Sequence, residues 1–371
     1  MSERASVGGG ARHLAALAKE PRPAGSDAED RARRWAELVL RDAGFVVSRE
    51  AFTYSAFPGR YGTPIGGAVG GATVLCAAWQ GLARGSGGGA LFALLIGVAL
   101  LLALARVMLG DGVLALPLLR ARSVNVVATR AGSTPRAWLV AHTDSKSQPL
   151  PSLVRVAGVT LLVGALALAL VAAALQLAAL PNRTAWWVAI LAALVGAVPV
   201  MASVVGARSA GALDNASGLA AVLRAAELLD PRAAVGVLLP SAEELGLAGA
   251  RAWARARAQD GAHAPGVALN CDGVDDEGEL TIMHGANPPA DVIAAIQRAS
   301  SRPVRVRRMP LGLLTDSVAL ADAGWRAVTV SRGSFASLRR VHTPDDSLAR
   351  LRGAGVDETA AVLARAAEAL A

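Results

Sequence analysis

Residues 137–144 read Ala-Trp-Leu-Val-Ala-His-Thr-Asp, a short apolar run that ends in polar residues. A run of this length is typical of a buried strand, and His142 and Asp144 stand at its end. Residues 235–244 (Val-Gly-Val-Leu-Leu-Pro-Ser-Ala-Glu-Glu) and residues 267–272 (Val-Ala-Leu-Asn-Cys-Asp) have the same form. In an open α/β sheet, ligands bind outside the carboxyl ends of the strands. We therefore expect these polar residues to lie together at one edge of a sheet.

Strand-like and helix-like segments alternate on both sides of these runs. We expect strands at residues 45–54, 123–129, 137–142, 233–239, 267–271 and 327–331, and helices at residues 27–42, 217–229, 248–259, 289–300 and 356–370. Such alternation is typical of a sheet that helices cover on both faces. The sequence therefore predicts an α/β fold with a mixed, mainly parallel sheet sandwiched by helices.

Four windows without any charged residue interrupt this pattern, at residues 61–83, 85–105, 156–182 and 184–207. About 20 apolar residues are enough to cross the hydrocarbon core of a bilayer, and Trp186 and Trp187 fit a position at its surface. The windows are too long and lack the polar face of a core helix. We predict four transmembrane helices in two hairpins, residues 61–110 and 153–207, that interrupt one α/β domain made of residues 1–60, 111–152 and 208–371. The lipid bilayer is then a partner of the chain.

Charge and cysteine content exclude two other classes of protein. Lys and Arg number 37 against 29 Asp and Glu, a net charge of +8, but acidic residues occur in all polar segments and no basic helix carries base-stacking aromatic residues. A basic balance alone does not indicate nucleic-acid binding, so we expect no nucleic-acid partner. Cys76 and Cys271 lie in apolar or strand-like runs, and two such cysteines build no disulfide framework.

Histidines and acidic residues gather near the expected strand ends. Asp214 precedes an Asn-Ala-Ser-Gly turn, and His342 lies in the segment Val-His-Thr-Pro-Asp-Asp at residues 341–346. Each residue also has a purely structural interpretation; Asp214, for example, is suited to cap the next helix. A metal site explains the whole set better, and its candidate residues are His142, Asp214, Glu243, Glu244, Asp272 and His342.

The kinds of side chain indicate the metal. Imidazole and carboxylate groups without a thiolate suit zinc, with manganese and cobalt as alternatives. Five ligands are too many for one catalytic zinc ion, but they suit two ions that share a carboxylate. Glu243 and Glu244 are neighbours and cannot both point at one ion, so one can ligate while the other acts on a water. Asp144 falls on the same strand face as His142 and is placed to orient its imidazole.

Five motifs in this order resemble the co-catalytic di-zinc aminopeptidase family, which is related to bacterial leucyl-type aminopeptidases, glutamate carboxypeptidase and glutaminyl cyclase. The motifs are His-x-Asp at residues 142–144, Asp-Asn-x-Ser-Gly at 214–218, Glu-Glu-x-Gly-x-x-Gly at 243–249, the strand-end Asp272 and His-Thr-Pro-x-Asp at 342–346. The resemblance covers residues 11–62 and 111–371 without the second hairpin.

The resemblance assigns a role to each candidate residue. It implies that His142 and Asp272 bind one zinc ion, that Glu244 and His342 bind the other, that Asp214 bridges them and that Glu243 is the general base. The family's usual Ser-Asp-His reads Thr315-Asp316-Ser317 here, which keeps Asp316 as a group behind the ligands but lacks the imidazole. His142 and Asp214 are 72 positions apart, an unusually long separation, because the second hairpin lies between them.

The resemblance also implies a zinc exopeptidase that hydrolyses peptide substrates through a metal-activated water. An aminopeptidase, which removes N-terminal residues, is our main hypothesis, because the second metal commonly receives the free α-amine of the substrate. A carboxypeptidase or glutaminyl cyclase activity at the same site is one alternative, and an inactive membrane receptor or scaffold is another.

The family's arrangement further implies that the first three expected strands form an antiparallel meander. The first hairpin would then leave and return, and the second would leave, at the sheet edge that carries His142. We expect the active site to open toward the bilayer, where it would favour short hydrophobic or membrane-associated peptides.

The catalytic domain of this multi-pass protein is predicted to face the cytoplasm, with the hairpins in the inner (plasma) membrane. Six arginines flank the hairpins on the domain side (Arg60, Arg106, Arg120, Arg122, Arg155 and Arg208), whereas the opposite turns carry Arg84 and Arg183. This bias follows the positive-inside rule, and residues 1–34 contain no signal-peptide core. A reporter fused after Ala371 should be active only in the cytoplasm, and activity only outside the membrane would contradict this topology.

Overall fold

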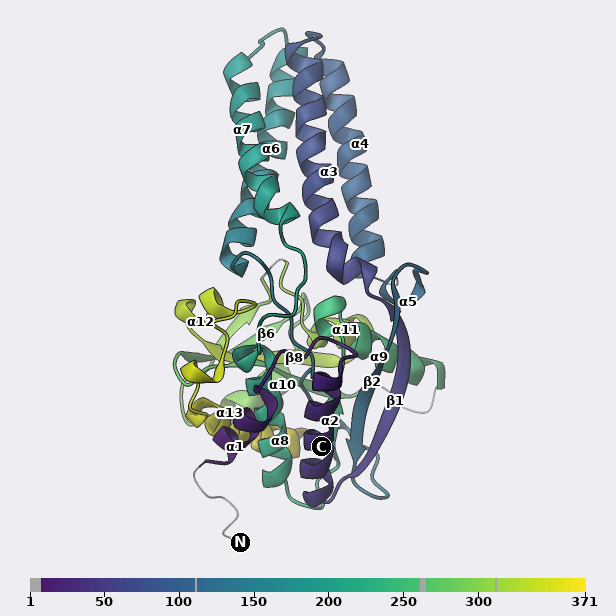
Figure 1. The fold of residues 1–371 in the computed structure, drawn as a ribbon, viewed down its shortest axis with the longest axis vertical. Helices are drawn as coiled ribbons and strands as arrows, with labels where there is room; N and C mark the ends of the chain where they lie inside the picture. Colours follow the sequence, from purple (N-terminus) through teal and green to yellow (C-terminus); the bar gives the residue numbers. More distant parts are fainter. Residues whose placement is uncertain (1–7, 111, 261–264, 311) are drawn as a thin grey trace. The chain divides into compact units, whose positions relative to one another are not determined.

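The computed structural model describes residues 8–110, 112–260, 265–310 and 312–371 (Figure 1). The chain divides into two compact units. The sheet unit comprises Met1–Tyr54, Arg120–Ser147 and Ala207–Ala371, and the helical unit comprises Ser55–Leu119 and Gln148–Gly206. Each unit contains its own cluster of buried apolar side chains.

An eight-stranded sheet runs through the sheet unit in the order β1-β2-β4-β3-β5-β8-β6-β7. Its strands are β1 (Val46–Ser55), β2 (Arg120–Thr129), β3 (Ala137–Val140), β4 (Val235–Leu239), β5 (Val267–Val274), β6 (Glu279–His284), β7 (Arg305–Arg308) and β8 (Arg326–Gly333). The central strands β4, β3, β5 and β8 are parallel, whereas β2 is antiparallel to β4 and β6 is antiparallel to β8. The predicted mixed, mainly parallel sheet is confirmed.

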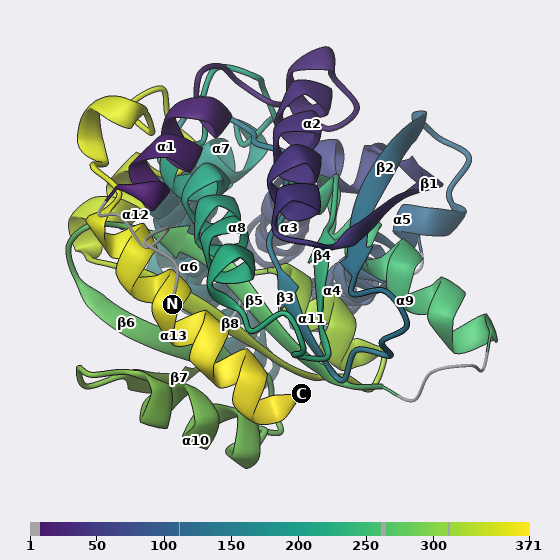
Figure 2. The same ribbon diagram turned by 90° about the horizontal axis from the view of Figure 1, so that it is seen from below.

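Helices cover both faces of this sheet (Figure 2). One face carries α1 (Gly9–Leu17), α2 (Asp27–Asp42), α8 (Gly218–Leu228), α10 (Ala290–Ala299) and α13 (Ala354–Leu370), and the other carries α9 (Ala248–Asp260) and α11 (Asp316–Asp322). Because successive strand residues point to opposite faces, Leu139 of β3 is buried in the first layer and Trp138 in the second. Trp138 there meets Trp253 of α9 edge to face. The short helix α12 (Phe335–Arg340) follows β8.

One expectation about the sheet is wrong, and two of its strands were not expected. β4 lies between β2 and β3, so the three strands expected to form an antiparallel meander do not do so. β2 nevertheless runs opposite to β3, which places the start of β2 at the same sheet edge as the carboxyl end of β3. The sequence pattern predicted neither β6 nor β7. β7 reads Arg-Val-Arg-Arg and is exposed along its whole length, as an edge strand can be, so it has no apolar signal.

The helical unit consists of α3 (Phe57–Leu82), α4 (Gly87–Leu109), the short α5 (Gly112–Ala115), α6 (Ser152–Leu177) and α7 (Arg183–Met201). The four long helices are long and apolar enough to cross a membrane. Their shared core is built mostly from alanine, while large side chains such as Phe92 and Leu102 of α4 point outward. Small residues inside and large ones outside suit a lipid environment, where helices associate through close packing rather than through exclusion of water.

Glycines of two helices meet at one point of close packing. A Cβ atom added at Gly158 of α6 would lie 2.8 Å from the carbonyl oxygen of Gly196 in α7 and 2.7 Å from Cγ of Pro199. A Cβ atom added at Gly164, on the same helix, would meet no atom within 4 Å. The two positions therefore differ in packing although they share a helix and a residue type.

Gly158→Val should destabilise the helical unit by about 1–3 kcal/mol, the usual cost of inserting methyl groups into a close-packed core. Gly164→Val is the matched control, because it carries the same change of helix propensity without the clash. Thermal unfolding of the detergent-purified protein measures both. Equal unfolding midpoints for the two variants would contradict the packing of α6 against α7.

Candidate metal centre

Parallel pairing brings three strand ends to one edge of the sheet. β3 pairs in register with β4 on one side and with β5 on the other. The polar residues that follow or end these strands therefore meet at their carboxyl edge. An irregular turn before α8 and the loop after α12 add one residue each. The edge gathers His142 after β3, Glu243 and Glu244 after β4, Asp272 within β5, Asp214 from the turn and His342 from the loop.

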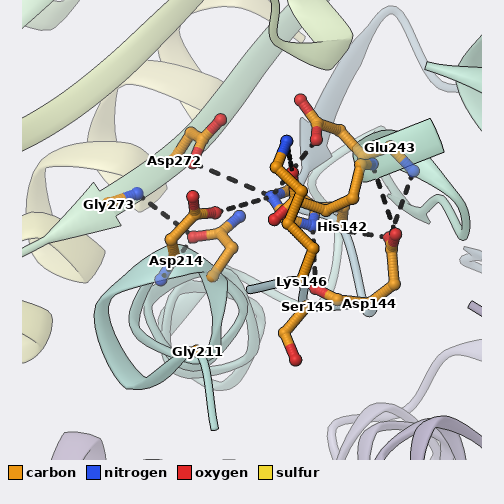
Figure 3. Close-up of polar contacts among 12 residues, drawn as sticks. His142, Asp144, Ser145, Lys146, Gly211, Asp214, Glu243, Asp272 and Gly273 are labelled. Atoms are coloured by element: carbon orange, nitrogen blue, oxygen red, sulfur yellow. Dashed lines mark hydrogen bonds and ion pairs between the residues drawn. The ribbon is translucent and has the colours of Figure 1, made fainter. Parts of the chain in front are cut away.

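Two groups of potential ligands share one carboxylate (Figure 3). In the first group, Nε2 of His142 lies 3.3 Å from Oδ1 of Asp214 and 3.8 Å from Oδ1 of Asp272. In the second, Nε2 of His342 lies 2.9 Å from Oδ2 of Asp214 and 3.4 Å from Oε1 of Glu244. Asp214 thus offers one oxygen to each histidine, the arrangement that a bridging ligand needs.

The donor atoms of both groups suit a metal ion. Among the residues that the structure describes, Nε2 of His142 and Oε1 of Glu244 are buried and make no hydrogen bond. Leaving buried polar atoms unpaired is costly unless another partner binds them. Imidazole nitrogens and carboxylate oxygens without a thiolate are the ligands of hydrolytic zinc sites, so the set fits zinc.

The charges around His142 also favour the binding of a cation. Burial lowers the pKa of His142, but the carboxylates of Glu243, Asp144, Asp214 and Asp272 outweigh it and raise that pKa well above its usual range. This concentration of negative charge around an imidazole attracts a cation, whether a proton or a metal ion.

Asp144 organises the site from behind the ligands. Its two carboxylate oxygens accept hydrogen bonds from the backbone N–H groups of Glu243 (3.1 Å) and Glu244 (3.2 Å). Its backbone oxygen lies 3.1 Å from Nδ1 of His142, and its Oδ1 lies 3.5 Å from the same nitrogen. The Nδ1 side of the imidazole is therefore engaged, which leaves Nε2 directed at Asp214 and Asp272. The predicted orienting contact is made mainly by the backbone of Asp144, and its side chain holds the glutamate turn.

Glu243 and Glu244 diverge because they lie in one tight turn, Glu243–Leu245. Glu244 belongs to the second ligand group, whereas Glu243 belongs to neither. Oε2 of Glu243 lies 4.0 Å from Nε2 of His142, beside the first group. Burial and the neighbouring carboxylates of Glu244, Asp272 and Asp316 raise the pKa of Glu243 well above its usual range, although His142 opposes them. A carboxylate with a raised pKa beside the ligands is a good proton acceptor.

Asp316 begins α11 and is fully buried. Neither of its carboxylate oxygens makes a hydrogen bond within the described ranges. Burial, aided by the charges of Asp144, Asp272 and Glu244 and opposed by His142, raises the pKa of Asp316 to about 8. The structure thus places Asp316 within the electrostatic reach of the site but without a direct bond to a ligand.

Two residues to which no role was assigned from the sequence hold the loop of Asp214. The carboxylate of Asp346 accepts the backbone N–H groups of Leu213 (2.6 Å) and Asp214 (3.1 Å), and burial raises its pKa to about 6. The guanidinium of Arg22 donates to the carbonyl oxygens of Thr143 (3.0 Å), Ala210 (2.6 Å), Gly211 (3.2 Å) and Leu17 (2.8 Å). Asp346 is the second aspartate of the His-Thr-Pro-Asp-Asp segment, and its position four residues after His342 was the signal that could have identified it.

A third residue missed from the sequence is Lys146, which follows Asp144 on the same loop. Its Nζ lies 2.5 Å from Oε2 of Glu244. The lysine therefore forms an ion pair with a candidate ligand, although lysine itself is not an expected zinc ligand.

Comparisons with known proteins agree with this architecture. Peptidase family M28 matches residues 125–367 of the chain. An aminopeptidase from Aneurinibacillus sp. strain AM-1 is similar in structure, with a TM-score of 0.56, 16% identity and coverage of 98% of this chain and 93% of that one. The glutaminyl cyclase of Fimbriiglobus ruber has a TM-score of 0.54 at 13% identity over 99% of this chain and 96% of its own.

A zinc aminopeptidase from Bacillus subtilis has a TM-score of 0.52 at 13% identity over 96% of this chain and 92% of its own. At these identities the structural likeness concerns the fold alone. No curated protein sequence matches the chain significantly.

Asp346→Ala should weaken zinc binding about 10- to 100-fold, the usual effect of removing a group that supports a ligand. The reason is that the backbone of Asp214 loses its acceptor. Asp345→Ala is the matched control, because Asp345 is the exposed neighbour in the same loop. Zinc retained after dialysis against graded chelator measures both variants, and equal retention would contradict the positioning role of Asp346.

Proposed function

The chain belongs to peptidase family M28, and on this premise we propose that it is a membrane-bound zinc aminopeptidase. It is a metal-dependent peptide hydrolase. The finer assignment rests above all on one observation, the two ligand groups that share Asp214. All five candidate ligands are present and converge, which favours an active enzyme over an inactive receptor or scaffold.

Each ligand has a proposed place. His142 and Asp272 would hold one zinc ion, Glu244 and His342 the other, and Asp214 both; manganese or cobalt would suit the same ligands. When bound, the ions supply Lewis acidity, which lowers the pKa of a water and polarises the peptide carbonyl. The residues around them supply orientation and proton transfer.

Glu243 is the proposed general base. It stands outside both ligand groups, beside the first, and among the described residues its buried carboxylate has an ion-pair contact with His142, at 4.0 Å, but with no lysine or arginine. It accepts the proton of the attacking water and returns it to the leaving amine. Asp144 holds the backbone of Glu243 and so fixes the position of this carboxylate.

An aminopeptidase is favoured over a carboxypeptidase by the chemistry of the second group. Asp214, Glu244 and His342 would hold one ion, and the carboxylates of Asp214 and Glu244 would attract the free α-amine of an N-terminal residue. A screen of aminoacyl amides, N-acetylated peptides and N-terminal glutaminyl peptides separates the candidates. Cleavage of free but not acetylated N-termini supports the proposal, whereas hydrolysis from the C-terminus or cyclisation of glutaminyl peptides would contradict it.

The four long apolar helices support a multi-pass membrane protein. We assign them to the inner membrane with the sheet unit in the cytoplasm, because arginines gather at the domain-side ends of the hairpins. Peptide substrates would then come from the cytoplasm.

Glu243→Gln should keep its metal content and lose at least about a hundredfold in kcat, the scale expected for a general base. Asp214→Ala should lose bound metal instead, because it removes a ligand from both groups. Metal content by mass spectrometry and turnover of an aminoacyl amide, measured on the same detergent-purified samples, distinguish the two effects. Full activity of Glu243→Gln would rule out the assigned base.

A further inference from the structure

Lys146 places a positive charge against Glu244, a member of the second ligand group. Its Nζ lies 2.5 Å from Oε2 of Glu244, and both side chains are largely buried, 15% and 4% exposed. Lys146 lies on the loop that follows β3, two positions after Asp144 (Figure 3). The chain contains 37 basic residues but only two lysines, Lys19 and Lys146, so this ammonium is chemically distinct from nearly every other cation in the molecule.

We propose that Lys146 makes the two metal positions unequal. It weakens the position of Asp214, Glu244 and His342, so that zinc fills the position of His142, Asp214 and Asp272 first. This inference rests on the proposed function, because it requires two metal positions.

Charge is the first argument. In the second group, the ammonium of Lys146 already neutralises Glu244 and stands close enough to repel a divalent cation. In the first group, no lysine or arginine forms an ion pair with His142 or Asp272 among the described residues. The ion-pair partners of His142 are all carboxylates, and the ion-pair partner of Asp272 is His142. Charges in a buried site are weakly screened, so one positive charge within a few ångströms changes the affinity for a dication strongly.

Geometry is the second argument. Lys146 binds Oε2 of Glu244, whereas Oε1 faces His342 and makes no hydrogen bond among the described residues. Glu244 is therefore held to one available oxygen and is prevented from binding an ion with both. The second position then has three single-atom ligands, Asp214, Glu244 and His342, of which one is already paired with a cation. At limiting zinc the chain would carry one ion, and the second position would respond to zinc supply.

The experiment measures zinc bound by the full chain in detergent as free Zn²⁺ is set with chelator buffers. The wild type should show two steps whose dissociation constants differ at least tenfold. His342→Ala should abolish the weaker step, and Asp272→Ala should weaken the tighter one. These ligand variants identify the steps without reference to activity.

Lys146→Met and Lys146→Gln should each tighten the weaker step at least tenfold and leave the tighter step unchanged. Lys146→Arg, which keeps the charge, should retain the gap between the steps. Lys19→Met is the matched control, because it removes the other lysine from an exposed loop, and it should change neither step.

If zinc bound no more tightly at the weaker step in both Lys146→Met and Lys146→Gln, the proposed role of Lys146 would be wrong. The unchanged tighter step shows that these two variants are folded. Two equal steps in the wild type would overturn it as well. If His342→Ala and Asp272→Ala left both steps intact, the two-metal site itself would fail, and the inference with it.

Discussion

Asp214 is the residue on which the site depends, because its two oxygens face two different histidines. Oδ1 lies 3.3 Å from His142 and Oδ2 lies 2.9 Å from His342, and the two histidines are 200 positions apart in the chain. A shared carboxylate can serve both groups only if the end of β3, the turn before α8 and the loop after α12 meet. The parallel pairing of β3 with β4 and β5 fixes the position of the end of β3, and it brings Glu243, Glu244 and Asp272 to the same edge of the sheet.

A layer of buried charge holds the loops in which the candidate metal ligands lie. Asp144 binds the backbone of the glutamate turn, Asp346 binds the backbone of Asp214, and Arg22 ties the loop after β3 to the segment before Asp214. Burying an ionised group is costly unless hydrogen bonds satisfy it. These three residues meet that condition by binding backbone groups, so the cost of burial is offset while irregular loops gain a defined shape.

The two units bury apolar surface in different ways. The sheet unit has a core of branched side chains between helices and strands, whereas the helical unit has alanine and glycine inside and large side chains outside. The first insertion lies between the end of β1 and the start of β2, the second follows the loop after β3, and the central strands β4, β3, β5 and β8 remain uninterrupted. At the base of the second insertion, the backbone N–H of Arg208 donates to Oγ of Ser147 at 2.8 Å. This bond links the two segments of the sheet unit that flank the second insertion, and so helps to bring His142 and Asp214 together although they are distant in the chain.

The sequence by itself determined the class of fold, the four apolar helices and the set of side chains that gather at the strand ends. These features have local signals: apolar runs of strand length, charge-free windows and polar residues at fixed positions after them. Only the tertiary structure decided that β4 separates β2 from β3, that Arg305–Arg308 forms an edge strand, and that Lys146 and Asp346 belong to the site. The physical reason is that strand order and side-chain pairing depend on residues distant in the chain. No local pattern records which carboxylate oxygen a lysine or a backbone N–H will reach.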